Sequence, residues 1–239
     1  MGSETTIRLW ARAFTRDVAL EGTAAGYAQL AKIVGDESLQ PRQMAELTPA
    51  GFTPRVAVCS QSSDWVVQSM ADSLDVMHTP PVPNTGLSIA EFCRRAGEQL
   101  ESVLKETEAR SSRIAVLWER LLPPSEEGEL ERVAGKLLNC PATFEKDLFE
   151  WDWRVAARVE RTFAEHSERT NTLATVKRVE ATYTGQRSDR LMLNTDVNTD
   201  PKAVSSRFGA ADVRAFVEEA ATWHDQLTSE VKTFLEVES

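Results

Sequence analysis

Apolar and polar positions alternate at the start of the chain and then change to a helical spacing. Residues 6–14 alternate, which predicts a half-buried strand. Residues 23–35 place apolar side chains three and four positions apart, which predicts an amphipathic helix that ends at a glycine. The connector that follows, residues 36–54, contains three prolines and is expected to hold at most one short helical turn, around Met44 and Leu47.

Three short strand candidates follow this connector in quick succession. The gaps between them are two residues long, which suits β-hairpins, and the candidates span residues 55–61, 64–70 and 73–78. A proline-rich loop then stops the sheet pattern, and the capping box formed by Ser88 and Glu91 predicts a long helix to about residue 108. The first half therefore has the predicted order β-α-β-β-β-α.

The second half repeats this order of elements. Its expected elements are a strand at 113–121, a helix from a cap at Ser125 to about 138, strands at about 149–163, 173–183 and 189–198, and a final helix at 210–235. We therefore predict the α+β class, with a duplicated βαβββα unit whose copies are residues 1–109 and 110–239 and together form one integrated domain. Because an antiparallel meander must cover its apolar face, the helices are expected mainly on one face of one curved sheet or of two abutting sheets.

Composition supports a folded protein and limits its partners. The 239 residues are 41% hydrophobic and 27% charged, which is ordinary for a globular protein. The net charge of −10 argues against a general affinity for nucleic acid or for an anionic membrane. No apolar run reaches the roughly 18 residues that cross a bilayer, and the N-terminus lacks the pattern of a signal peptide, so a cytoplasmic location is expected.

Motifs for metal, cofactor or nucleophilic chemistry are not found in the sequence. The cysteines Cys59, Cys93 and Cys140 are far apart and form no C-x-x-C pair, which fits reduced thiols. The chain has no phosphate-binding glycine loop, dinucleotide fingerprint, nucleophile elbow or H-E-x-x-H sequence. We therefore predict no cofactor, no metal and no catalytic residues, although an enzyme of unrecognised type stays open because distant residues can assemble a site without a local motif.

Charged and apolar residues alternate most clearly in residues 151–161. The apolar positions are expected in the core, and they are Trp151, Trp153, Val155 and Val159. The solvent side is expected to present arginines from this strand and from the next two, namely Arg154, Arg158, Arg178 and Arg190. An ordinary solvated face with cross-strand ion pairs is the alternative interpretation. A nucleic-acid platform of interleaved aromatic and arginine side chains is less favoured than core packing.

Charge is distributed unevenly over the second half. Residues 151–190 hold eight Lys or Arg and six Asp or Glu, whereas residues 210–239 hold two basic and seven acidic residues. A mildly basic meander beside an acidic helix favours a docking surface for an acidic protein partner. The leading hypothesis is therefore a non-enzymatic interaction or accessory protein. A homodimer that closes exposed strand edges stays open as well.

The histidines His78, His166 and His224 have no partner at the spacing of a metal or catalytic site. His224 is expected at the boundary of the core on the final helix. A second hypothesis is a small-molecule-binding module, since a curved sheet and a long helix can enclose a pocket, with Tyr183, Trp223 and His224 as the expected lining residues. An enzyme would need a cleft that brings one of the histidines beside a carboxylate or a cysteine.

Several short stretches of the chain resemble a single family. They are DRLMLNTDV at residues 189–197, ATWHD at 221–225 with Phe234-Leu235 after it, and DWVVQ at 64–68. Over roughly half of its length the chain resembles a sporadically distributed family of uncharacterised bacterial proteins of similar length. The resemblance implies a bacterial cytoplasmic protein carried on mobile or defence-related loci, and it supplies no catalytic residues.

Overall fold

The structure, a computed structural model, describes residues 4–18, 20–49, 51–81, 86–126, 128–138, 150–183, 186–202 and 204–237. Within these ranges the chain forms four helices and nine strands. The helices are α1 (Ala24–Val34), α2 (Ile89–Glu106), α3 (Glu129–Leu137) and α4 (Ala210–Leu235). The strands are β1 (Thr5–Phe14), β2 (Leu39–Thr48), β3 (Gly51–Ser60), β4 (Trp65–Ser69), β5 (Ser73–His78), β6 (Arg113–Pro124), β7 (Asp152–Phe163), β8 (His166–Tyr183) and β9 (Gln186–Thr199).

The nine strands join one antiparallel sheet in the order β2-β3-β4-β5-β1-β6-β9-β8-β7. Strands β1 and β6, the first strands of the two halves of the chain, are neighbours in the middle of the sheet. Each is flanked on its outer side by the last strand of its own half, β5 beside β1 and β9 beside β6. The predicted α+β class with an antiparallel sheet is confirmed.

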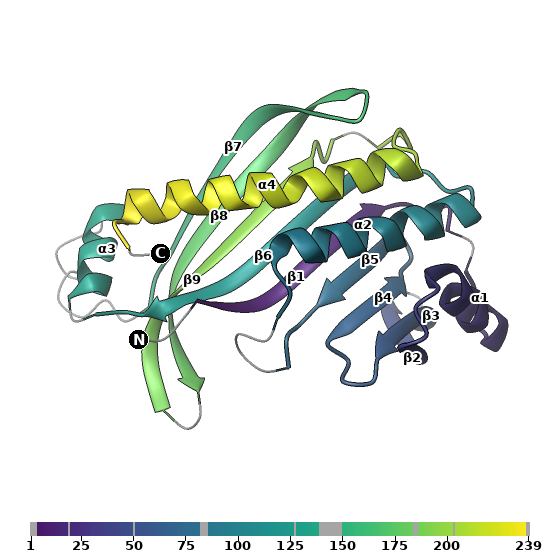
Figure 1. The fold of residues 1–239 in the computed structure, drawn as a ribbon, viewed down its shortest axis with the longest axis horizontal. Coiled ribbons are helices and arrows are strands. Elements are labelled where there is room, and N and C mark those ends of the chain that lie inside the picture. The colour runs from purple at the N-terminus through teal and green to yellow at the C-terminus, as the bar shows by residue number, and fades with distance from the viewer. Residues whose placement is uncertain are drawn as a thin grey trace.

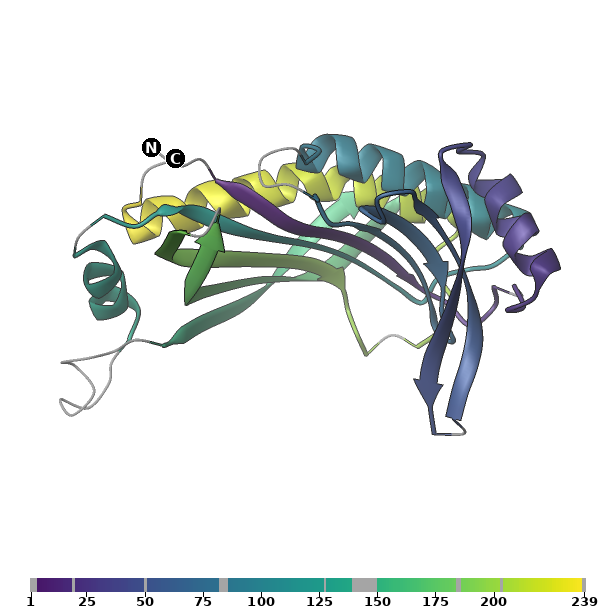
Figure 2. The ribbon, with the colours of Figure 1, turned by 90° about the horizontal axis from the view of Figure 1, so that it is seen from below.

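Helices α2 and α4 lie side by side along one face of the sheet, as Figure 1 and Figure 2 show. Their apolar side chains, including Phe92 and Leu100 of α2 and Phe216 of α4, pack against Val76 of β5 and Val116 of β6 in one core. A second cluster joins α3 and the end of α4 to β8 and β9. Among the described residues, no helix is long and apolar enough to span a membrane.

The sequence predicted helix caps at Ser88 and Ser125, and the starts of α2 and α3 can be compared with them. The Ser88 Oγ accepts a hydrogen bond from the backbone N–H of Glu91 at 3.2 Å, so the predicted start of α2 is confirmed. The predicted cap at Ser125 is wrong, because β6 runs further than expected and α3 begins only at Glu129. The preceding Gly128 has a φ of 78°, a left-handed conformation that glycine adopts at low cost.

Strand β2 is the largest difference from the prediction. Residues 36–54 were expected as a connector with a short helical turn, but residues 39–48 form β2 and residues 51–54 begin β3. The two strands pair along the whole of Leu39–Thr48. Pro41 is tolerated there because β2 is the outermost strand, where a missing backbone donor need not break a ladder on both sides. The first half therefore contains one strand more than predicted.

Strand β7 forms the opposite edge of the sheet, and this position exposes side chains that were expected in the core. Trp151 is buried and Trp153 is half-buried, but Val155 is 44% exposed and Val159 is 37% exposed. Val155 pairs with the buried Ala174, so the alternation identified the correct side of the strand. The exposure follows because β7 has a neighbouring strand on one side only.

Candidate functional site on the open face of the sheet

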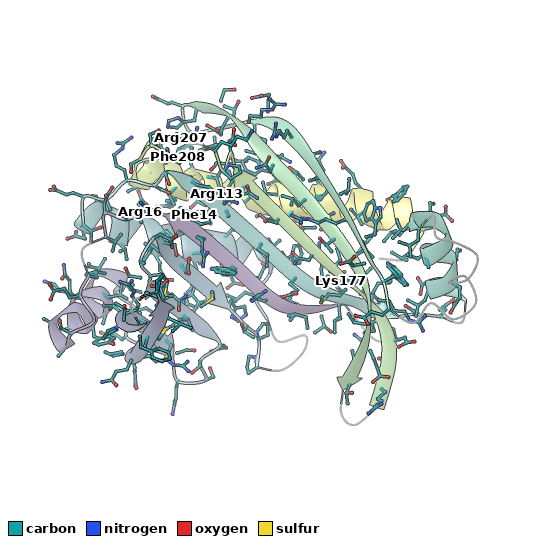
Figure 3. All side chains as sticks on the ribbon, turned by 180° about the vertical axis from the view of Figure 1, so that it is seen from behind. Phe14, Arg16, Arg113, Lys177, Arg207 and Phe208 are labelled. Carbon is teal, nitrogen blue, oxygen red and sulfur yellow. The ribbon has the colours of Figure 1, made fainter. Side chains whose placement is uncertain are left out.

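The face of the sheet turned away from α2 and α4 is called the open face here, and Figure 3 shows it from behind the view of Figure 1. On β1, Leu9 and Ala11 point into the core, so the residues that alternate with them point to the open face. These residues are Arg8, Trp10, Arg12 and Phe14. Residues directly opposite one another on paired strands share a face, so the register extends this assignment to the other strands.

Arginine and aromatic side chains alternate along β1 on the open face. The guanidinium carbon of Arg12 lies 4.2 Å from the centre of the Trp10 ring. Arg12 donates two hydrogen bonds to Asp75, at 2.6 and 2.9 Å, and the Asp75 side chain is fully buried. Arg8 pairs with Glu119 at 3.1 Å. Because both arginines already have carboxylate partners, they are weak candidates for binding an acidic partner.

Arg154 and Arg158 lie on β7 and point to the open face, opposite Thr175 and Asn171 of β8. Both arginines are exposed. No carboxylate lies within ion-pair distance of either one in the described part of the chain. They are four residues apart, which is about 13 Å along a strand. The edge of the open face therefore presents two cations whose cross-strand neighbours are neutral.

Arg190 also points to the open face, because it pairs with Val179 of β8. Its side chain is buried, however, and its Nε donates a hydrogen bond to the Ser188 Oγ at 3.3 Å. Arg190 shares the face with Arg154 and Arg158 without offering an exposed charge there.

Arg178 lies on the other side of the sheet, opposite the core residue Leu191, and its guanidinium is 2.5 Å from Asp189. The cause is the turn at residues 164–165, which pairs the even-numbered positions of β7 with odd-numbered positions of β8. The sequence interpretation placed even-numbered arginines of all three strands on one face. The register of the β7–β8 hairpin separates Arg178 from the rest.

An amide and carboxylate network in the middle of the open face was not predicted. The Asn171 Nδ2 donates to the Asn198 Oδ1 at 3.1 Å, and the Asn198 Nδ2 donates to the Asp196 Oδ1 at 3.0 Å. Burial raises the pKa of Asp196, against the effects of the Asn198 hydrogen bond and of the positive charges of Arg113 and Arg154. The alternating polar residues of β9 were the sequence signal for this network.

Two of the three residues predicted to line a pocket, Trp223 and His224, lie in the core. His224 is fully buried, with its Nδ1 2.8 Å from the Thr195 Oγ1 and its Nε2 3.1 Å from the Val116 carbonyl oxygen, so neither ring nitrogen is free for a ligand. Trp223 is buried beside it in the core, and the side chain of Tyr183 lies outside the described residues. Two pockets lie elsewhere, one of about 810 Å³ between α1 and the β2–β3 hairpin and one of about 350 Å³ at the end of β1.

The other histidines and the described cysteines lie in different surroundings, and His166 is beside a carboxylate. His166 begins β8, and its Nε2 lies 3.2 Å from an oxygen of Asp212, which also caps α4. The Nδ1 of His78 contacts the backbone carbonyl of Asp64, and burial lowers the pKa of this histidine. Burial raises the pKa of the Cys93 thiol, which disfavours the reactive thiolate. Cys140 lies outside the described residues, and the described ones contain no group of acidic, His or Cys side chains that could hold a metal.

The two sides of the molecule differ in charge. Helices α2 and α4 together carry nine acidic and five basic residues. On β7 and β8 the open face has more basic than acidic positions, namely Arg154, Arg158, Arg169 and Lys177 against Asp152 and Glu160. Asp152 pairs with Lys177 and Glu160 pairs with Arg169, so opposite charges face each other in these two rows. The excess positive charge is therefore that of Arg154 and Arg158.

Comparisons with known proteins do not assign the chain to a family. Neither a protein-family model nor a curated protein matches it. The open face, with its exposed arginines, is therefore the feature from which a function can be inferred.

Proposed function

We propose that the protein is a non-enzymatic interaction or accessory protein that binds an acidic protein partner on the open face, at Arg154 and Arg158. One observation carries this proposal. Both guanidinium groups are exposed on the edge strand β7, and the residues across the ladder are neutral. An exposed cation that forms no ion pair within the described residues can attract an acidic group on another molecule.

The charge on the opposite side supports one orientation of the partner. An acidic surface is attracted to β7 and repelled by α2 and α4, so electrostatics favours docking on the open face and speeds the encounter. A partner that covers the edge of β7 also meets the exposed Val155 and Val159 on the other side of the strand. Apolar contact of this kind adds affinity that charge alone does not supply.

We also infer that the chain consists of two copies of a βαβββα unit that meet near residues 109 and 110. The support is the strand order, which is mirrored about the pair of β1 and β6, with β2 as an addition to the first copy. The helices then gather mainly on the face opposite the open face. The resemblance noted from the sequence adds a bacterial cytoplasmic setting, in which an immunity protein or adaptor of a defence-related locus is the role we propose.

Reversing both charges, in Arg154→Glu/Arg158→Glu, is expected to weaken partner binding by about tenfold or more, because attractive contacts become repulsive. The tagged protein is used to capture its partner from a lysate of the native host, and mass spectrometry identifies the partner. Isothermal calorimetry with the purified partner then gives the dissociation constant for the wild type and the variant. The wild-type affinity should fall as salt concentration rises, because the arginines are exposed.

The matched control is Lys32→Glu/Lys105→Glu, which changes the net charge equally but places the reversals on the exposed surfaces of α1 and α2. This control is expected to bind like the wild type. Unchanged binding by the β7 variant, or equal losses in both variants, would remove the open face from the proposal. Recovery of a nucleic acid, or of the protein alone as a dimer, would contradict an acidic protein partner.

A further inference from the structure

The pocket of about 350 Å³ lies where the end of β1 meets the start of β6. Its walls come from four segments that are distant in the sequence: the end of β1 with the residues after it, the β4–β5 turn, the start of β6 and the loop after β9. Figure 3 shows Phe14, Arg16 and Arg113 close together at this end of the open face. Arg154 and Arg158 do not line the pocket, so it is separate from the proposed docking site.

Among the lining residues, Arg113 is the one that indicates a ligand with an anionic group. Its guanidinium carbon lies 4.7 Å from the centre of the Phe14 ring, which holds the side chain against the pocket wall. Its Nε is buried and has no hydrogen-bond partner among the described residues, and the side chain forms no ion pair there. Burial lowers the pKa of Arg113, and Asp196 and Asp200 partly offset this at a distance. A half-buried cation without a direct partner is stabilised when an anion enters beside it.

Asp17 and Asp72 give the same pocket negative charge. Both side chains are exposed, and neither forms an ion pair within the described ranges. The Oδ2 of Asp17 accepts a long hydrogen bond of 3.4 Å from the Ser206 hydroxyl. The backbone of Asp72 is fixed beside the end of β1, because its carbonyl oxygen accepts a hydrogen bond from the Thr15 N–H at 2.9 Å. The two carboxylates therefore come from separate segments that line the same pocket.

We propose that this pocket binds a small zwitterion of amino-acid size, whose carboxylate faces Arg113 and Arg16 and whose ammonium faces Asp17 and Asp72. The charged lining side chains balance, with two basic and two acidic. A phosphate or a dicarboxylate would be repelled by the aspartates, and a simple cation would be repelled by the arginines. A ligand that carries both charges satisfies both pairs.

The rest of the lining fits a ligand with a neutral apolar side chain. Apolar surface is contributed by Phe14, Pro201 and Val204. The volume of about 350 Å³ is at the lower end of the range for small-molecule pockets, which suits an amino acid better than a nucleotide. The lining also contains the hydroxyl residues Thr15, Ser112 and Ser206, each of which has a hydrogen bond within the chain.

The test uses L-leucine as the probe and measures binding to the full chain by isothermal calorimetry and by shifts of backbone amide resonances. Leucine is expected to bind with a dissociation constant of about 1 mM or lower. It should also shift the amide resonances at the end of β1 and at the start of β6. N-acetyl-leucine lacks the ammonium and leucinamide lacks the carboxylate, so each is expected to bind at least about tenfold more weakly. No binding of leucine at about 10 mM, or equal binding of the three compounds, would overturn the proposal. Binding of inorganic phosphate in their place would show a simple anion site and would overturn it too.

Single substitutions test which residues contact the carboxylate and the ammonium of the ligand. Arg113→Gln and Asp17→Asn are each expected to weaken leucine binding by at least about tenfold, because each removes one charged contact. Lys105→Gln on α2 is the control and should bind leucine like the wild type. Asp17 is exposed, so its variant is expected to fold even if Arg113→Gln does not. Wild-type affinity in both pocket variants would place the ligand elsewhere. Because Arg154→Glu/Arg158→Glu should keep leucine binding, failure of either proposal can be recognised separately.

Discussion

Replacing Phe216 with alanine is expected to lower the free energy of unfolding by about 3–5 kcal/mol. Phe216 is fully buried on α4, and its ring meets those of Phe163 and Trp223 edge-to-face, at centroid distances of 5.0 and 5.3 Å. Phe163 lies at the end of the edge strand β7, so the Phe216 ring packs the long helix α4 against that edge. Alanine leaves a cavity at this junction and removes both ring contacts.

Phe234→Ala is the matched control, because it makes the same substitution on the same helix at a position that is 47% exposed. Phe234 stacks on Trp153 at a centroid distance of 6.1 Å, so its loss is expected to cost about 1 kcal/mol. Urea unfolding followed by circular dichroism gives both values. Equal losses in the two variants would contradict the packing of α4 against the sheet described above.

Acidification from pH 7 to pH 4.5 is expected to remove about 2–3 kcal/mol of stability through His224 alone. Burial, assisted by repulsion from the nearby Arg120 guanidinium, lowers the pKa of His224 from 6.5 to about 3. The unfolded chain takes up this proton near pH 6.5, whereas the folded protein resists it until about pH 3. The contribution of the neutral ring is therefore fully present above pH 6.5 and is lost progressively as the pH falls toward 3.

The comparison that isolates this group is His224→Gln, whose amide can still hydrogen-bond to Thr195 and Val116 but does not titrate. Unfolding free energies of both proteins are measured from pH 7 to pH 4.5. The wild type should lose more stability than the variant, which cancels the contributions of other groups such as His78 and Asp196. A wild-type His224 ring that titrates near pH 6.5 in the folded protein, seen by NMR, would show that the side chain is not buried as described.

Local sequence patterns predicted the elements whose signals depend only on residues close together in the chain. The alternation of residues 6–14 and the cap at Ser88 gave β1 and the start of α2, because both signals depend only on nearby residues. Strand β2 was missed because Pro41 reads locally as a loop, while its edge position, set by β3, makes proline acceptable. The exposure of Val155 was missed for a related reason, since alternation reports the side of a strand and not whether the strand is an edge.

The candidate sites depend more strongly on tertiary structure than the individual helices and strands do. Arg154 and Arg158 could be placed on one face from their spacing, but the side of Arg178 depends on the register of a hairpin that the sequence does not fix. The pocket around Arg113 and Asp17 is assembled from four distant segments, so no spacing in the sequence indicates it. Mixed charge in such a pocket appears only when the chain has folded.

Site-specific photo-cross-linking tests the use of the open face most directly. A photoreactive amino acid replaces Ala156, which is exposed on the open face between Arg154 and Arg158, and in a second protein it replaces Lys105, which is exposed on α2. With the captured partner present, a cross-link is expected from position 156 and not from position 105. A cross-link from position 105 alone would contradict docking on the open face.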